Sequence, residues 1–106
     1  MLSEKSRRHQ LYREFIDEAS ASYIDALTTD TPNLAKQIHL YSLVSSMRMV
    51  SSREVIDSAH GITQLIIKSY LQPNKELREI MELANKEEFL DPLREFSKAC
   101  RKELDG

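Results

Sequence analysis

The chain of 106 residues has one cysteine, two glycines, three prolines and no tryptophan. A single cysteine cannot form an intrachain disulfide, which argues against a small disulfide-stabilised domain and favours a reducing compartment. So few glycines and prolines argue against a β fold rich in tight turns. No apolar run approaches the roughly 18 residues that cross a bilayer, and no signal-peptide pattern opens the sequence. These absences predict a cytoplasmic protein, or a soluble part of a larger one.

Charge is abundant but nearly balanced, with 15 basic and 17 acidic side chains and a formal net charge of −2. Because a nucleic-acid-binding surface normally carries a clear positive excess, no nucleic acid is predicted as a partner. Apolar residues make up 41% of the chain, which is enough for one small core. The length fits a single domain over residues 1–106.

The most apolar stretch runs from Val55 to Leu71 and has the periodicity of a helix. At about 100° per residue, its apolar side chains fall on one arc and its polar ones on the opposite arc. The sequence Ser51-Ser52-Arg53-Glu54 fits a capping box with Ser51 as the N-cap, and Pro73 is expected to end the helix. The predicted buried side chains are Val55, Ile56, Ala59, Ile62, Thr63, Ile66, Ile67 and Tyr70.

A second helix is predicted before this one, from about Pro32 to Val50, with Thr31 as its N-cap. Only the two serines separate the two helices, so they are expected to form an antiparallel hairpin. Gln37 and Arg48 are expected to project into the apolar side of this helix. The predicted apolar side consists of Leu34, Ile38, Leu40, Tyr41, Val44 and Met47.

Three further helices are predicted, from about Ser3 or Glu4 to Leu27 or Thr28, from roughly Lys75 to Glu87, and from Asp91-Pro92 onward. Their short connections favour up-and-down neighbours. The predicted fold class is all-α, an antiparallel up-and-down bundle of four principal helices with a short fifth helix at the C-terminus. The core residues predicted on the first and last of these helices are Tyr12, Phe15, Ile16, Ala19, Tyr23, Ala26, Leu27, Leu93, Phe96, Cys100 and Leu104.

Asp57 and His60 are three residues apart and therefore share one surface of their helix. An acid and a histidine at this spacing form half of the carboxylate-bridged dimetal site found in helical bundles. An exposed His60 also suits a phosphotransfer bundle. A second acid–histidine pair is missing, and the residues after His60 do not match phosphotransfer proteins. A surface contact between the two side chains is the favoured interpretation.

The turn before that helix carries Arg48, Ser51, Ser52 and Arg53. Free N–H groups at a helix start, with two guanidinium groups nearby, can form an anion or ion-pair site. Alternatively, Arg48 interacts with the carboxyl end of its own helix or pairs with an acid of a neighbouring helix. Because Arg48 lies within the apolar arc, we expect it to be partly buried.

No nucleophile has an identifiable base partner, and there is no glycine-rich phosphate loop, CxxC or GxSxG motif. Cys100 lies on the apolar stripe of the last helix and is interpreted as a small buried hydrophobe. The sequence therefore predicts no catalytic residue, no metal site, no cofactor and no small-molecule substrate. We do not expect an enzyme.

The first 13 residues carry Lys5, Arg7, Arg8 and Arg13 against only Glu4. Such a cluster is typical of a solvated helix face. It is also typical of the cytoplasmic flank of a membrane-spanning segment, or of a surface that meets anionic lipid.

Apolar groups spread around more of the 32–50 helix than one core-facing side requires. They include Leu40, Leu43, Met47, Met49 and Val50. Surfaces bearing methionine can adapt to a partner helix. The sequence therefore predicts a non-enzymatic interaction module that binds a protein partner or a second copy of itself.

Three stretches, QLYREFIDEASASYIDAL, LYSLVSSMRMVSSREVIDSA and DPLREFSKACRKEL, together resemble a group of short uncharacterised bacterial proteins. In that group the helical unit often follows membrane-spanning helices. The resemblance covers roughly residues 10–104 and carries no chemical motif. It implies a bacterial helical module on the cytoplasmic side of a membrane, and it implies no activity.

Overall fold

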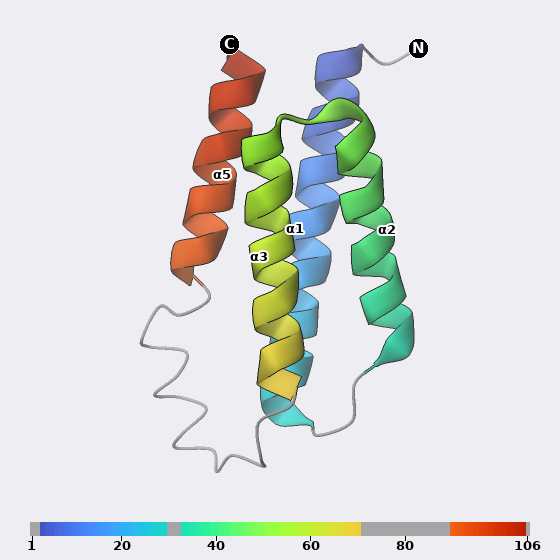
Figure 1. Cartoon of the computed structure of the whole chain (residues 1–106). Coiled ribbons are helices and arrows are strands. Elements are labelled where there is room, and N and C mark those ends of the chain that lie inside the picture. The colour runs from blue at the N-terminus through green and yellow to red at the C-terminus, as the bar shows by residue number, and fades with distance from the viewer. Residues whose placement is uncertain (1–2, 30–32, 71–89, 106) are drawn as a thin grey trace.

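A computed structural model of the chain describes residues 3–29, 33–70 and 90–105. These residues form four α-helices, α1 (Glu4–Thr28), α2 (Leu34–Val50), α3 (Arg53–Tyr70) and α5 (Leu90–Asp105), and contain no strand. The helices lie side by side along a common direction (Figure 1). The predicted all-helical fold is confirmed. Pro73 and the helix predicted over residues 75–87 lie outside the described residues.

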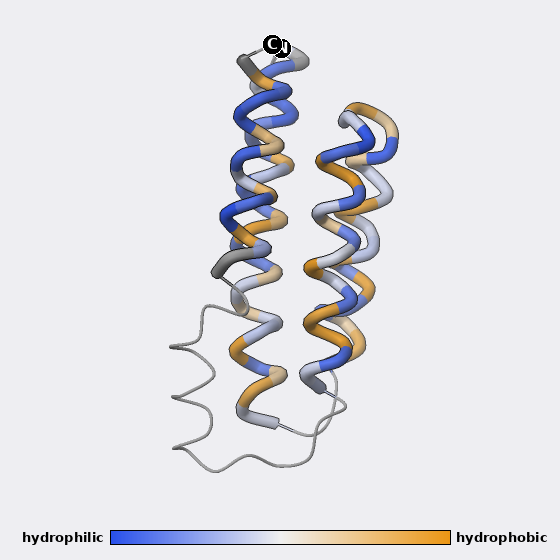
Figure 2. The backbone as a smooth tube through the Cα atoms, turned by 60° about the vertical axis from the view of Figure 1, so that its left-hand side comes forward, coloured by the Kyte–Doolittle hydropathy of each residue, from blue (hydrophilic) through white to orange (hydrophobic). Residues whose placement is uncertain are grey.

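The two central helices are α1 and α3, each of which packs against the three other described helices. In contrast, α2 packs mainly against α1 and α3. Hydrophobic residues recur at intervals along every helix, between hydrophilic ones (Figure 2). Their buried members form one continuous core.

Helix α1 has the predicted bounds and the predicted core face. Its first turn is capped by Ser3, whose side chain accepts a hydrogen bond from the Ser6 N–H at 3.1 Å. Phe15 and Ala19 are fully buried, and Ile16 packs against the core from its edge. The other predicted core residues of this helix, Tyr12, Tyr23, Ala26 and Leu27, are also buried.

The apolar face of α3 is confirmed, but its N-cap is one residue later than predicted. Ser51 still belongs to the end of α2, because its N–H donates to the Met47 carbonyl at 2.7 Å. Ser52 is the N-cap, since its hydroxyl accepts from the Val55 N–H at 3.4 Å. Of the predicted face, Ile56 and Ile67 are half-buried and the other six side chains are buried.

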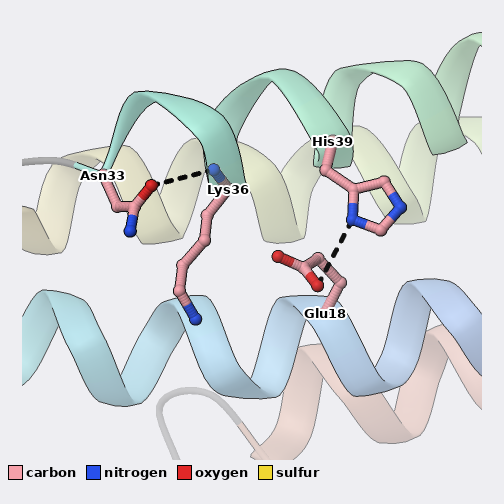
Figure 3. Close-up of polar contacts among 4 residues, drawn as sticks. All are labelled: Glu18, Asn33, Lys36 and His39. Carbon is pink, nitrogen blue, oxygen red and sulfur yellow. Dashed lines mark hydrogen bonds and ion pairs between the residues drawn. The ribbon is translucent and has the colours of Figure 1, made fainter.

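Helix α2 departs most from the prediction. It begins at Leu34 rather than Pro32, because Asn33 is the N-cap and accepts from the Lys36 N–H at 3.1 Å (Figure 3). Three side chains predicted to be buried are exposed, and so is Arg48. The observed buried set is Gln37, Leu40, Leu43, Val44 and Met47, and the exposed apolar set is Leu34, Ile38, Tyr41 and Met49.

The last helix, α5, begins at Leu90, before the predicted start at Asp91-Pro92, so both of these residues lie in its first turn. It has 16 residues, one fewer than α2. Phe96 is fully buried and packs its ring against Phe15, with ring centroids 5.0 Å apart. Cys100 is buried as predicted, while Leu93 and Leu104 pack against the core from its edge.

Polar contacts link the helices outside the core. Nδ1 of His39 on α2 lies 3.3 Å from a Glu18 carboxylate oxygen on α1, an ion pair when the imidazole is protonated (Figure 3). Toward the other end of α1, the Tyr70 hydroxyl of α3 donates to the Asp25 carboxylate. Burial, together with this hydrogen bond, raises the pKa of Tyr70 to about 12.

Candidate functional site

The turn between α2 and α3 carries a shallow depression of about 510 Å³. It brings together most of the residues that the sequence singled out, since α2 ends beside the start of α3. Its lining consists of Arg48, Ser51, Arg53, Ile56, Asp57 and His60. Of the predicted anion-site residues, Ser52 is not part of this lining.

One N–H group at the start of α3, that of Ser52, already has an anionic partner from the chain itself. The Glu103 carboxylate of α5 accepts a hydrogen bond from the Ser52 N–H at 2.5 Å. Arg53 pairs with Asp57 at 3.8 Å on the exposed side of α3. The negative charge that the helix N-terminus favours is therefore supplied by Glu103, and sequence inspection alone gave no sign of this contact.

Glu103 also holds the hydroxyl of Tyr12 on α1, which donates to its second carboxylate oxygen. The same hydroxyl lies 2.7 Å from the Ser51 hydroxyl and can accept its proton. Burial and the contact with Glu103 raise the pKa of Tyr12 well above its ordinary value of 10.0. The hydrogen bonds of this cluster connect α1, α5 and the α2–α3 turn, so the cluster stabilises the packing of these elements.

Asp57 and His60 both lie on the surface of α3 and line the depression. Neither is joined there by further acids or histidines, because residues 3–29, 33–70 and 90–105 contain no group of three or more metal-ligating side chains. On the neighbouring α1, Glu14 and Asp17 are exposed, and Glu18 contacts His39. The structure thus places Asp57 and His60 on one surface of α3, where the ion-pair partner of Asp57 is Arg53 rather than His60. The alternative of a dimetal site lacks its further ligands among the described residues.

A second depression, of about 580 Å³, lies between the N-terminal half of α1 and the C-terminal half of α5. Lys5 and Arg13 of the predicted basic cluster line it, and Arg7 and Arg8 do not. We refer to it as the α1–α5 groove. Lys5, His9 and Arg13 recur every four residues and so share a face of α1. This spacing is visible in the sequence and could have identified one wall of the groove. The opposing wall could not be predicted, since it depends on which helix packs beside α1.

Among the described residues, the largest set of exposed apolar side chains lies on α2. Leu34, Ile38, Tyr41 and Met49 are 72%, 68%, 48% and 85% exposed, respectively. At about 100° per residue, they fall on one arc that faces away from the buried set. We call these four residues the α2 stripe. Of the surface predicted from the sequence, Leu40, Leu43 and Met47 lie in the core, Val50 is half-buried and only Met49 is exposed.

Compared with known proteins, the chain matches no family model, no curated protein and no solved structure. None of the four described helices combines the length and the hydropathy that crossing a membrane requires. The α2 stripe and the α1–α5 groove are therefore interpreted from their own chemistry.

Proposed function

We propose that the chain is a non-enzymatic helical interaction module that binds a protein partner, or a second copy of itself, through the α2 stripe. The observation that carries the proposal is the placement of exposed apolar side chains. Of the five large apolar side chains that are exposed among the described residues, four lie on this one face of α2 and the fifth, Ile24, lies on α1. Scattered exposed apolar residues are normal, but a contiguous apolar face typically marks a contact surface.

The α2 stripe has the spacing that a partner helix recognises. Leu34, Ile38 and Tyr41 follow one another at four and three residues, and Met49 continues the arc two turns later. The stripe extends for about 22 Å at 1.5 Å per residue. Between Tyr41 and Met49 the arc is continued by Ser45, which is small and uncharged. A helix packed along these four side chains would bury mainly apolar atoms, with the exposed Arg48 at the edge of the contact.

The finer architecture and the cellular setting belong to the same proposal. We propose that the whole chain is an antiparallel up-and-down bundle with shorter helices toward the C-terminus, on the cytoplasmic side of a bacterial membrane. Support for the setting comes from the sequence resemblance and from the exposed basic residues Lys5, Arg7 and Arg13 at the start of α1.

The test uses matched substitutions on two helices. Ile38 and Ile24 are 68% and 63% exposed, so lysine at either position adds the same charge at a similar cost to folding. We expect analytical ultracentrifugation of the wild-type protein to show concentration-dependent association that Ile38→Lys abolishes and Ile24→Lys preserves. If the wild type is a monomer, the stripe is expected to bind a different protein. That protein should co-purify with the wild type and with Ile24→Lys but not with Ile38→Lys. A monomer whose co-purifying proteins are the same in all three would contradict both self-association and partner binding through the stripe.

A further inference from the structure

The α1–α5 groove combines an apolar floor with a cationic rim. Its floor includes the side chains of Ile16, Cys100 and Leu104, and its rim carries Lys5, Arg13 and Arg101. Along α1 the lining extends from residue 5 to residue 17, about 18 Å at 1.5 Å per residue. The upper part of α1 lies beside α5 along this length (Figure 2).

The cations of the rim are not neutralised by the protein. Arg13 and Arg101 reach the groove from opposite helices, and neither they nor Lys5 has an ion pair with a described side chain. Among the other exposed cations of the described surface, Arg53, Lys98 and Lys102 have acidic partners, whereas Arg48 and Lys68 have none. Like charges that face a common space repel each other, so this arrangement favours an anion between them.

The charges also give the groove a direction. Lys5, His9 and Arg13 lie toward the N-terminus of α1, and Asp17 lies at the other end of the lining. An anionic group is therefore favoured near the cations and disfavoured near Asp17. At that second end the α1 side chains in the lining are Ile16, which is apolar, and Asp17.

The floor stays uncharged at physiological pH. Burial raises the pKa of the Cys100 thiol to about 12, so the thiol remains protonated. Tyr12 beside it has its hydroxyl held by Glu103 and its ring packed edge-on against Phe96, with centroids 6.0 Å apart. These contacts fix the floor before any ligand arrives, which lowers the entropic cost of binding.

We propose that the α1–α5 groove binds a single-chain anionic amphiphile of the fatty-acid class. Its head group lies between Arg13 and Arg101, and its alkyl chain lies along the apolar floor toward Ile16. The volume of about 580 Å³ falls within the roughly 300–1,000 Å³ of small-molecule sites. A flat bilayer surface would not fill such a hollow, whereas a free single chain would.

The first experiment uses the wild-type protein and decanoate as the probe, followed by two-dimensional NMR of the backbone amides. We expect shifts confined to α1 and α5, with affinity that rises about fourfold for each methylene along the series hexanoate, octanoate and decanoate. Butyrate, which has the head but little chain, and decyltrimethylammonium, which has the chain but a cationic head, should both bind far more weakly.

The second experiment removes the cations. The double variant Arg13→Gln/Arg101→Gln should lose about tenfold or more in decanoate affinity, because two charge-assisted contacts are lost. The matched control Lys36→Gln/Arg48→Gln removes two cations from α2 and should bind as the wild type does. If the groove variant does not fold, the ligand series on the wild-type protein still decides the question.

Several outcomes would overturn the proposal. They are shifts that map to the α2 stripe, equal binding of the cationic amphiphile, affinity independent of chain length, and equal losses in the two double variants. A final experiment mixes the protein with phosphatidylglycerol vesicles. If the protein sediments with the vesicles but does not bind monomeric decanoate, the basic residues bind a membrane surface and the proposal is wrong.

Discussion

Helices α2 and α3 are almost equal in length, with 17 and 18 residues, yet the bundle uses them differently. Helix α3 packs against three other helices and leaves no large apolar side chain exposed. Helix α2 packs mainly against two and leaves four exposed. The difference shows that the number of neighbours, and not the apolar content of a helix, decides how much of it is buried.

The two helices also begin differently. The first turn of α2 is capped by its own Asn33. The start of α3 is held in addition by Glu103 from α5, which binds the Ser52 N–H and the Tyr12 hydroxyl together. Thus the start of α3 is fixed by a contact from a distant part of the chain, whereas the start of α2 is capped locally.

The largest effect should come from the same truncation on the two helices. Ile62 on α3 is fully buried and Ile38 on α2 is 68% exposed. We expect Ile62→Ala to lower the free energy of unfolding by about 2–5 kcal/mol, since it removes buried methylenes and leaves a cavity. Ile38→Ala should change it by less than about 0.5 kcal/mol. Urea denaturation measures both, and similar losses would show that α2 is covered in solution.

Alkaline pH should give the next largest effect, because several buried groups contribute together. The pKa values of Tyr70 and Cys100 are raised to about 12, from ordinary values of 10.0 and 9.0. Above pH 9 these groups ionise first in the unfolded chain, so their contribution to stability is complete below pH 9 and should be lost steadily toward pH 12. Tyr70→Phe should flatten the decline between pH 10 and 12. Stability that did not change over this range would contradict the burial of these groups.

A smaller loss is expected from Glu103→Ala. The substitution leaves the Ser52 N–H without its acceptor and removes one partner of the Tyr12 hydroxyl, at a cost of about 1–3 kcal/mol. Glu95→Ala is the control on the same helix, because Glu95 is exposed and pairs only with Lys98. It should cost less than about 1 kcal/mol. Equal losses in thermal denaturation would mean that the tie to α3 contributes little.

The smallest effect should be that of Arg48→Ala in the last turn of α2. Arg48 was expected to be partly buried, but it is exposed. Its removal should therefore change the free energy of unfolding by no more than about 0.5 kcal/mol. A clear drop in melting temperature would restore the interpretation of Arg48 as a buried ion-pair residue and narrow the contrast between α2 and α3.

The apolar pattern alone was sufficient for α1 and α3. Each has a single apolar arc, and that arc must turn inward because water excludes it. The predicted bounds of α1 and the predicted face of α3 are accordingly confirmed. The pattern was ambiguous for α2, which has apolar residues on two arcs. The choice between Leu43 and Ile38 as core residues could not be made locally.

Local chemistry therefore determined that this chain folds into helices and which side chains of α1 and α3 form the core. Tertiary structure decided which arc of α2 is exposed, that Glu103 binds the Ser52 N–H at the start of α3, and that Arg13 and Arg101 line the same groove. The reason is physical. Helix periodicity reports on residues three and four positions apart. The tertiary contacts join distant residues: Glu103 lies 51 positions from Ser52 and 91 from Tyr12. Such contacts depend on which helices become neighbours.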